Sequence, residues 1–199
     1  MGKEIITWDN AKQISEDLLK EITTVNEGFL SDINNKQGLY IVAYEGNELG
    51  LGFWGANEPK IIFVGKAKSD SSRHFQSGTT GASTLRRSLG ALLQNQLELI
   101  PIPRSQDKAD NDRYDNYAFD EASEVKLTNW ILENFQVAFL PYDKENIDDL
   151  RKALIEYNIP IFNFQNNPAN KYGAQIKSWR KKCAEEAKAM HNAQCTMHN

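Results

Sequence analysis

The chain has 199 residues, a mass of 22.6 kDa and a formal net charge of −4 at pH 7. With 40% hydrophobic and 25% charged residues it has the composition of a globular protein and not of a disordered chain. No apolar run reaches the roughly 18 residues of a membrane span, and two cysteines are too few for a disulfide framework. Its first residues lack the apolar segment of a signal peptide, so we expect a cytoplasmic protein that does not enter membranes.

Residues 1–37 are expected to form a helical lead in front of the main domain. Apolar residues recur at helical spacing from Ala11 to Thr23, and either Asp9 or Asn10 can cap this helix. Residues 25–36 are polar, and we predict that they form a connecting segment.

Two short apolar runs follow, and each is rich in β-branched and aromatic residues. Gly38–Tyr44 and Lys60–Gly65 have the composition of buried strands. Residues 45–59 between them contain four glycines, which favours a turn and therefore an antiparallel strand pair over a helical crossover.

Helices and one further strand are predicted in the remainder of the chain. Ser83 or Thr84 is a suitable cap for a helix, and residues 107–124 form an acidic, loop-like stretch. The predicted elements are helix 85–96, helix 122–134, strand 135–140, helix 145–157 and helix 172–190, the last with exposed basic residues. We therefore expect an α/β fold with a small, mainly antiparallel three-stranded central sheet flanked by helices.

The segment from the second strand onward is basic, although the chain as a whole is acidic. Six Lys and Arg residues lie between Lys60 and Arg87, against the single acidic residue Asp70. Phosphate attraction depends on charges within a Debye length, about 8 Å in physiological salt, so a local cationic face can bind nucleic acid despite the net charge.

The start of the predicted helix at residue 85 is a candidate anion site. Hydroxyl groups, free backbone N–H groups and two arginines lie together there, at the positive end of the helix dipole. The candidate phosphate contacts are Ser83, Thr84, Arg86 and Arg87. The alternative is an ordinary capped helix whose arginines are solvated.

The order of four short motifs resembles that of the GIY-YIG nuclease superfamily. Gly38-Leu39-Tyr40 stands where the first signature tripeptide would, and Phe63-Val64-Gly65 stands where the second would. Arg73 lies eight residues after Gly65, and Pro160-Ile161-Phe162-Asn163 resembles the closing Pro-x-aromatic-Asn element. The resemblance predicts a GIY-YIG-like domain over residues 38–165, and we expect a basic C-terminal helix and tail over residues 166–199.

The resemblance implies that the protein hydrolyses phosphodiester bonds, with DNA as the expected partner and Mg²⁺ or Mn²⁺ as the cofactor. By the same resemblance, Tyr40 would orient or deprotonate the attacking water, and Arg73 would hold the phosphate. Lys66 could add a phosphate contact. His74 could carry a proton, although a packing role in its loop is an equal alternative.

Three residues are expected to support this site without reacting. Phe63 occupies the place of the second signature tyrosine, so the packing of a ring is kept and one hydroxyl is lost. Gly65 and Asn163 are the other two.

One position departs from the pattern of the superfamily. Counting back from Pro160, the metal-binding glutamate is expected at residue 151, and this residue is an arginine. Arg151 cannot bind a divalent cation, but it could bind phosphate. Asp148, one turn earlier on the same helix face, could substitute as the metal ligand.

Three interpretations therefore stay open. In the first, Asp148 restores the metal site, and the chain is a metal-dependent endonuclease. In the second, the domain binds nucleic acid without cutting it. In the third, it is a scaffold whose acidic stretch docks a protein partner. A different alignment of this helix with the superfamily pattern, in which residue 151 does not correspond to the glutamate, would also account for the arginine at this position.

Overall fold

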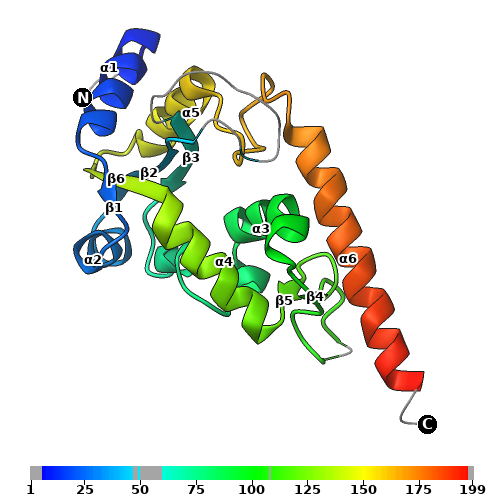
Figure 1. Cartoon of the computed structure of the whole chain (residues 1–199). Coiled ribbons are helices and arrows are strands. Elements are labelled where there is room, and N and C mark those ends of the chain that lie inside the picture. The colour runs from blue at the N-terminus through cyan, green and yellow to red at the C-terminus, as the bar shows by residue number, and fades with distance from the viewer. Residues whose placement is uncertain (1–5, 47–48, 50–59, 108, 197–199) are drawn as a thin grey trace. The chain divides into compact units, whose positions relative to one another are not determined.

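The computed structural model describes residues 6–46, 49, 60–107 and 109–196 (Figure 1). The chain divides into two compact units that interleave along the sequence. Unit 1 comprises Met1–Asn47, Phe53–Ser72 and Leu132–Lys171, and unit 2 comprises Glu48–Gly52, Arg73–Ile131 and Tyr172–Asn199. The domain limits predicted at residues 37/38 and 165/166 stay predictions. Within the described ranges, every helix is too short or too polar to cross a membrane.

Unit 1 contains an antiparallel sheet of four strands in the order β1-β6-β2-β3. These strands are β1 (Thr23–Thr24), β2 (Gly38–Tyr44), β3 (Lys60–Lys66) and β6 (Phe135–Pro141). The antiparallel pairing of β2 with β3 is confirmed. The predicted number of three strands is wrong, because the short strand β1 pairs with β6 and adds a fourth.

The central strand explains the continuous apolar run in the sequence. β2 lies between β3 and β6, and its first six residues are buried. A strand that is covered on both faces needs apolar side chains at successive positions, without alternation.

Three helices belong to unit 1: α1 (Trp8–Lys20), α2 (Glu27–Asn35) and α5 (Ile147–Asn158). α1 begins earlier than predicted because Thr7 and Asn10 form a capping box, in which each side chain accepts the backbone N–H of the other residue. α1, α5 and the sheet share one hydrophobic core, which includes Ala11, Leu18, Leu39, Ile41, Val64, Leu150 and Leu154.

The helix α2 corrects the prediction of a polar connecting segment. Asn26 caps it by accepting the N–H of Phe29 at 3.0 Å. Phe29 and Ile33, four residues apart, are buried on one side of the helix. Phe29, Leu30 and Ile33 are the three apolar residues among the nine, and only two of them are buried, so the periodic signal is weak and the sequence pattern did not reveal this helix.

Unit 2 is mainly helical. Its helices are α3 (Thr84–Leu97), α6 (Gly173–Thr196) and most of α4 (Glu121–Asn134). It also contains the 3₁₀ turn η2 (Thr80–Ala82) and the strands β4 (Pro101–Ile102) and β5 (Ala118–Phe119). The 3₁₀ turn η1 (Ser71–His74) begins in unit 1 and ends in unit 2. The predicted helices over residues 85–96, 122–134 and 172–190 are confirmed. Gly90 lies inside α3, where a Cβ would overlap the ring of Phe119, so the glycine permits close packing.

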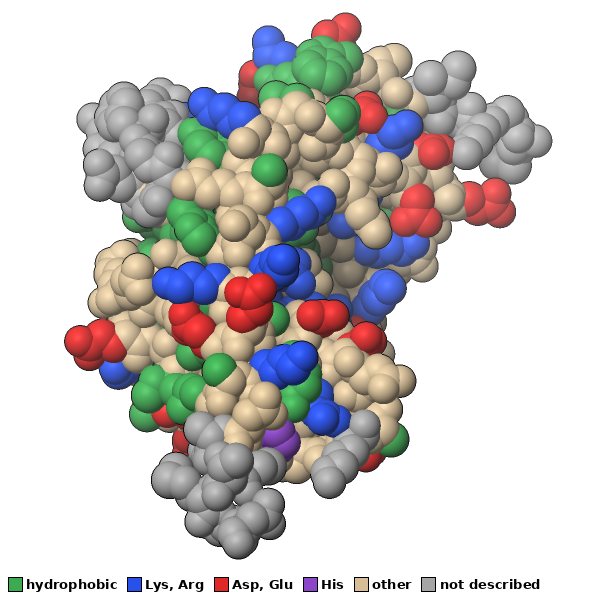
Figure 2. Space-filling view, turned by 90° about the vertical axis from the view of Figure 1, so that its right-hand side faces the viewer, with side chains coloured by type: hydrophobic (Ala, Val, Ile, Leu, Met, Phe, Trp, Pro, Cys, Tyr) green, Lys and Arg blue, Asp and Glu red, His purple; other side chains and the backbone are tan. Residues whose placement is uncertain are grey.

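The surface carries both signs of charge, as 23 basic and 27 acidic residues require. Figure 2 shows Lys and Arg side chains interspersed with Asp and Glu side chains on one face. Any cationic site is therefore local, and its position has to be read from individual residues.

Candidate functional site

The two signature tripeptides meet in the sheet of unit 1. Tyr40 of β2 is the register partner of Gly65 in β3. A Cβ at Gly65 would overlap the ring and hydroxyl of Tyr40, so the glycine provides the space that this ring occupies. Phe29 and Phe63 pack against the ring, with centroids 6.1 Å and 6.0 Å away. The supporting roles predicted for Phe63 and Gly65 are consistent with this packing.

Tyr40 lies in the interior of the protein. Only 1% of its surface is exposed, which is unusual for a group expected to handle solvent water. Its predicted role toward the attacking water stays a proposal.

Asn163 forms hydrogen bonds along the outer edge of β3. Its side-chain oxygen accepts the Val64 N–H at 2.8 Å, and its side-chain nitrogen donates to the Val64 carbonyl at 3.0 Å. The amide thus imitates the pairing of a neighbouring strand and satisfies both backbone groups of a buried residue. The backbone N–H of Phe162 donates to the Ile62 carbonyl at 3.1 Å and extends this attachment.

Lys66, Asp148 and Arg151 lie close together where β3 ends and α5 begins. Lys66 Nζ is 2.9 Å from Asp148 Oδ1 and 3.1 Å from Oδ2. Burial lowers the pKa of Arg151, while the phenol of Tyr40 and the carboxylate of Asp148 act in the opposite direction. The sequence expectation that Asp148 and Arg151 share one helix face is therefore supported.

This group does not fit a divalent cation as it is arranged. It offers one carboxylate, and both oxygens of that carboxylate contact the Lys66 ammonium. The guanidinium of Arg151 adds a second positive charge, and its buried Nε has no hydrogen-bond partner. Among the residues that the structure describes, no cluster of three His, Cys, Asp or Glu side chains could hold a metal ion. Positive charge at this place suits a phosphate oxygen better than a metal.

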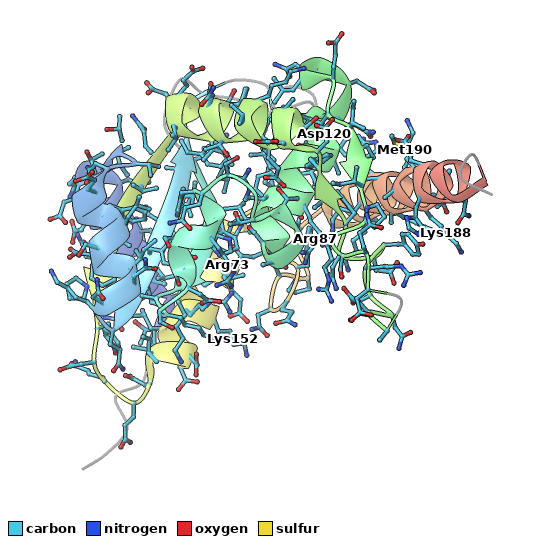
Figure 3. The ribbon with its side chains drawn as sticks, turned by 90° about the horizontal axis from the view of Figure 1, so that it is seen from below. Arg73, Arg87, Asp120, Lys152, Lys188 and Met190 are labelled. Carbon is cyan, nitrogen blue, oxygen red and sulfur yellow. The ribbon has the colours of Figure 1, made fainter. Side chains whose placement is uncertain are left out.

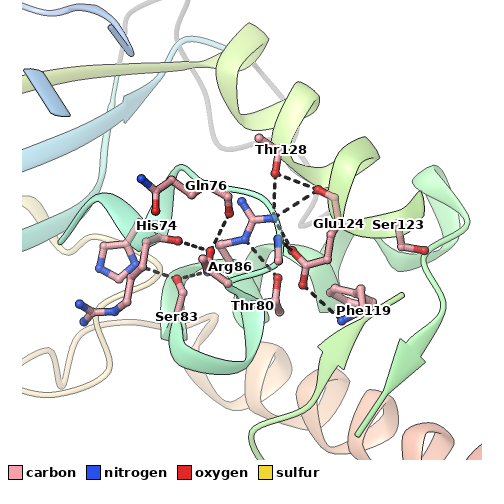
Figure 4. A network of polar contacts seen from close by, with 12 residues as sticks. His74, Gln76, Thr80, Ser83, Arg86, Phe119, Ser123, Glu124 and Thr128 are labelled. Carbon is pink, nitrogen blue, oxygen red and sulfur yellow. Dashed lines mark hydrogen bonds and ion pairs between the residues drawn. The ribbon is translucent and has the colours of Figure 1, made fainter. Parts of the chain in front are cut away.

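In unit 2, Arg73 (Figure 3) and His74 (Figure 4) are attached to the segment before α3. Arg73 Nε donates to the Ala82 carbonyl at 3.1 Å. His74 is buried, and its Nδ1 lies 2.7 Å from Ser83 Oγ. Ser83 Oγ also accepts the Arg86 N–H at 3.1 Å and caps α3. Ser83 is therefore occupied and buried, so its predicted phosphate contact is corrected to a capping role.

Arg86 forms the centre of a polar network in the interior of unit 2 (Figure 4). Its surface is completely buried, and its Nη2 lies 2.7 Å from Glu124 Oε2. Arg86 Nε also donates to Thr80 Oγ1 at 3.1 Å, and Glu124 Oε2 accepts the Gly78 N–H at 3.1 Å. The prediction that Arg86 binds phosphate is wrong for this structure, because a buried carboxylate on α4 is already its partner.

Arg87, the next residue, has a different environment. It is 6% exposed, and its two terminal nitrogens donate to the Thr80 and Gly81 carbonyls and to Thr84 Oγ1. None of these acceptors carries a charge. Burial lowers the pKa of Arg87 to about 10, and three further arginines add to this effect: Arg180, Arg104 and Arg73. Thr84 is exposed at the start of α3 and stays a candidate phosphate contact.

Sequence reasoning missed the contribution of Arg104 and Arg180. Arg180 belongs to the predicted basic helix, but its sequence distance from Arg87 gave no sign that the two lie close together. Arg104 is held by Asp110, with two nitrogen–oxygen distances of 2.7 Å. Tyr40 belongs to unit 1 and Arg73 to unit 2, so their predicted convergence on one phosphate stays a prediction.

One of three comparisons with known proteins found a match. The GIY-YIG catalytic domain matches residues 53–182, which is more than half of the chain. The matched residues include Phe63-Val64-Gly65, Arg73 and Asn163, and they begin after Gly38-Leu39-Tyr40. The comparison with curated proteins and the comparison with solved structures found no match.

Proposed function

The chain belongs to the GIY-YIG catalytic-domain family, whose members act on nucleic acid as nucleases, and we propose that it hydrolyses phosphodiester bonds in DNA. The observation that carries this proposal is the pairing of Tyr40 with Gly65 across two strands. The two tripeptides, which are separated by 22 residues, lie side by side in the antiparallel strands β2 and β3.

Four residues of the candidate site have a role in this proposal. Arg73 holds two phosphate oxygens and stabilises the negative charge that develops on them. Lys66 and Arg151 reduce the repulsion between the backbone phosphates and the acidic protein. The Tyr40 phenol orients the attacking water once the substrate is bound.

Divalent cations serve this family generally, and Mg²⁺ and Mn²⁺ are the cations to test here. Because the arrangement of Lys66, Asp148 and Arg151 does not fit a metal ion, no catalytic step is assigned to one. The same arrangement favours a second function, a domain that binds nucleic acid without cutting it.

One assay separates the two functions. Purified protein is incubated with single-stranded, duplex and branched DNA and with RNA, in the presence of Mg²⁺, Mn²⁺ or a chelator. The products are separated on a denaturing gel. Cutting that is lost in both Tyr40→Phe and Arg73→Ala supports hydrolysis. Salt-sensitive binding without cutting, weakened by Arg73→Ala, supports the binding domain. No affinity for any nucleic acid contradicts both and leaves the docking scaffold.

Two further variants sharpen the result. Asp148→Ala tests the substitute metal ligand, since full metal-dependent activity in this variant removes Asp148 from the reaction. Lys152→Ala is the matched control, because Lys152 is an exposed cation of α5 that pairs with Glu156 at 3.7 Å. It should retain wild-type activity. Thermal unfolding of each variant confirms that it is folded.

A further inference from the structure

A group of arginines in unit 2 lacks the negative charge that would balance it. Within the described part of the chain, no carboxylate pairs with Arg87 or Arg180. α3, which carries Arg87, packs against α6, which carries Arg180. Among the neighbouring charges, Arg180 lowers the pKa of Arg87 the most. Like charges at a half-buried position repel each other, and an anion between them would relieve this repulsion.

A pocket beside Arg180 provides room for an anion that the Arg180 guanidinium could contact, and Arg87 is not among the residues that line it. A pocket of about 270 Å³ is lined by Asp115, Lys177, Arg180, Lys181 and Ala184. Three of these side chains are cationic and one is acidic, so the pocket is positive overall. Arg180 is half-buried, and the helix α6 that carries it packs against α3.

Arg87 differs from an ordinary buried arginine of the interior. Its Nη groups are held by backbone carbonyls, which fixes the plane of the guanidinium without neutralising it. Its buried Nε has no hydrogen-bond partner, but the same is true of Arg86 Nη1, so the two arginines differ in the charge of their acceptors. Arg87 also lies in the first turn of α3, where the helix dipole adds positive potential.

We propose that Arg87 and Arg180 form a second phosphate-binding site, which holds a backbone phosphate of the bound nucleic acid. The site rests on the proposed action on nucleic acid and adds to it a contact surface built from α3 and α6. Arg87 supplies a fixed positive charge, and Arg180 supplies the guanidinium that contacts the phosphate. Arg104 is already held by Asp110 and only adds to the local potential.

The first test measures nucleic-acid binding as a function of salt. Binding of duplex and single-stranded DNA is followed by fluorescence anisotropy in the presence of a chelator, so that no cutting occurs. We expect Arg180→Gln to weaken binding about tenfold at low salt. Its plot of log Kd against log salt should lose about one unit of slope, as expected for one lost phosphate contact.

The matched control is Lys188→Gln. Lys188 is an exposed cation of the same helix, two turns beyond Arg180 (Figure 3). The Lys188→Gln substitution removes one positive charge, as Arg180→Gln does. It should leave the DNA affinity and the slope of log Kd against log salt near those of the wild type. An unchanged slope in Arg180→Gln, or an equal loss in both variants, would overturn the site.

The second test uses inorganic phosphate as the probe and thermal unfolding as the readout. In chloride, Arg180→Gln should raise Tm slightly, because the repulsion on Arg87 is relieved. In phosphate at the same ionic strength, the wild type and Lys188→Gln should gain more Tm than Arg180→Gln does. The proposal would be overturned if Arg180→Gln had a lower Tm than the wild type in chloride and gained as much Tm in phosphate as the wild type does. That result would show that Arg180 has a purely structural role.

The two proposals fail in distinguishable ways. Absence of cutting with intact, salt-dependent binding contradicts hydrolysis and leaves the second site in place. Normal cutting with an unchanged salt slope in Arg180→Gln contradicts the second site and leaves hydrolysis in place.

Discussion

Unit 2 contains two consecutive buried arginines that differ in the charge of their hydrogen-bond partners. On one side of α3, Arg86 is paired with Glu124 and surrounded by further hydrogen bonds. On the other side, Arg87 is held by uncharged oxygens and lies near another arginine. A buried charge with an oppositely charged partner is neutralised, and removing either partner leaves the other buried and unpaired. A buried arginine without such a partner retains positive potential that a ligand can use.

The candidate site in unit 1 lies between these extremes. Lys66 and Asp148 form an ion pair, but their side chains are 33% and 76% exposed. Such a pair can open when a phosphate competes for the lysine, because water stabilises the carboxylate that is left. The degree of burial thus predicts how much each charged group contributes to stability.

The largest effect is expected at the buried pair. Arg86→Met should lower the free energy of unfolding by about 3–5 kcal/mol, because Glu124 would be left buried without its partner. Arg87→Met removes the same volume and charge from the adjacent position and should cost less than about 2 kcal/mol, since only uncharged acceptors lose a donor. Urea denaturation of both variants measures the difference.

Equal losses in these two variants would break the comparison between Arg86 and Arg87. The double variant Arg86→Met/Glu124→Leu sharpens it further. This variant should recover much of the stability that Arg86→Met loses, because no unpaired charge remains in the interior.

A neutral buried contact should have an intermediate effect. Asn163→Ala leaves the N–H and the carbonyl of Val64 without partners and should cost about 1–3 kcal/mol. Asn35→Ala is the control, because Asn35 is exposed and only donates to Ser31 within its own helix. It should change stability by less than about 0.5 kcal/mol. Comparable losses in the two variants, measured by thermal unfolding, would contradict the role of Asn163 at the sheet edge.

The exposed ion pair of unit 1 should contribute little. Lys66→Ala is expected to lower the free energy of unfolding by less than about 1 kcal/mol, and this loss should shrink as salt is added. Urea denaturation at low and high ionic strength checks both statements. A loss as large as that of Arg86→Met would show that exposure is a poor guide to the charges of this protein.

The last effect is confined to high pH and concerns a neutral buried group of unit 2. Burial raises the pKa of the Cys183 thiol to about 11, from an ordinary value of 9. The stability that this neutral thiol contributes is fully present below pH 9 and is lost as the pH rises toward 11. In a Cys195→Ser background, alkylation of the native protein should be slow at pH 8 and should accelerate up to about pH 11. Rapid alkylation at pH 8 would contradict the burial.

Much of the fold could be predicted because local patterns agree with it. The strands β2, β3 and β6 are short, mainly apolar runs rich in β-branched and aromatic residues, as is typical of buried strands. Ser83 and Thr84 are the two predicted caps of α3, and Ser83 is the one whose hydroxyl accepts an N–H three residues ahead. β1 could not be predicted, because a strand of two residues exists only through its pairing with β6.

The sequence by itself determined most of the strands and helices, with α2 and β1 as the exceptions, because side-chain periodicity and capping act over a few residues. Only the tertiary structure decided the role of each charge. Arg86 and Arg87 are consecutive, but they point about 100° apart on α3. Arg86 therefore pairs with Glu124, 38 residues further along the chain, and has a structural role. Arg87 instead lies in the field of Arg180, which makes it a candidate binding residue.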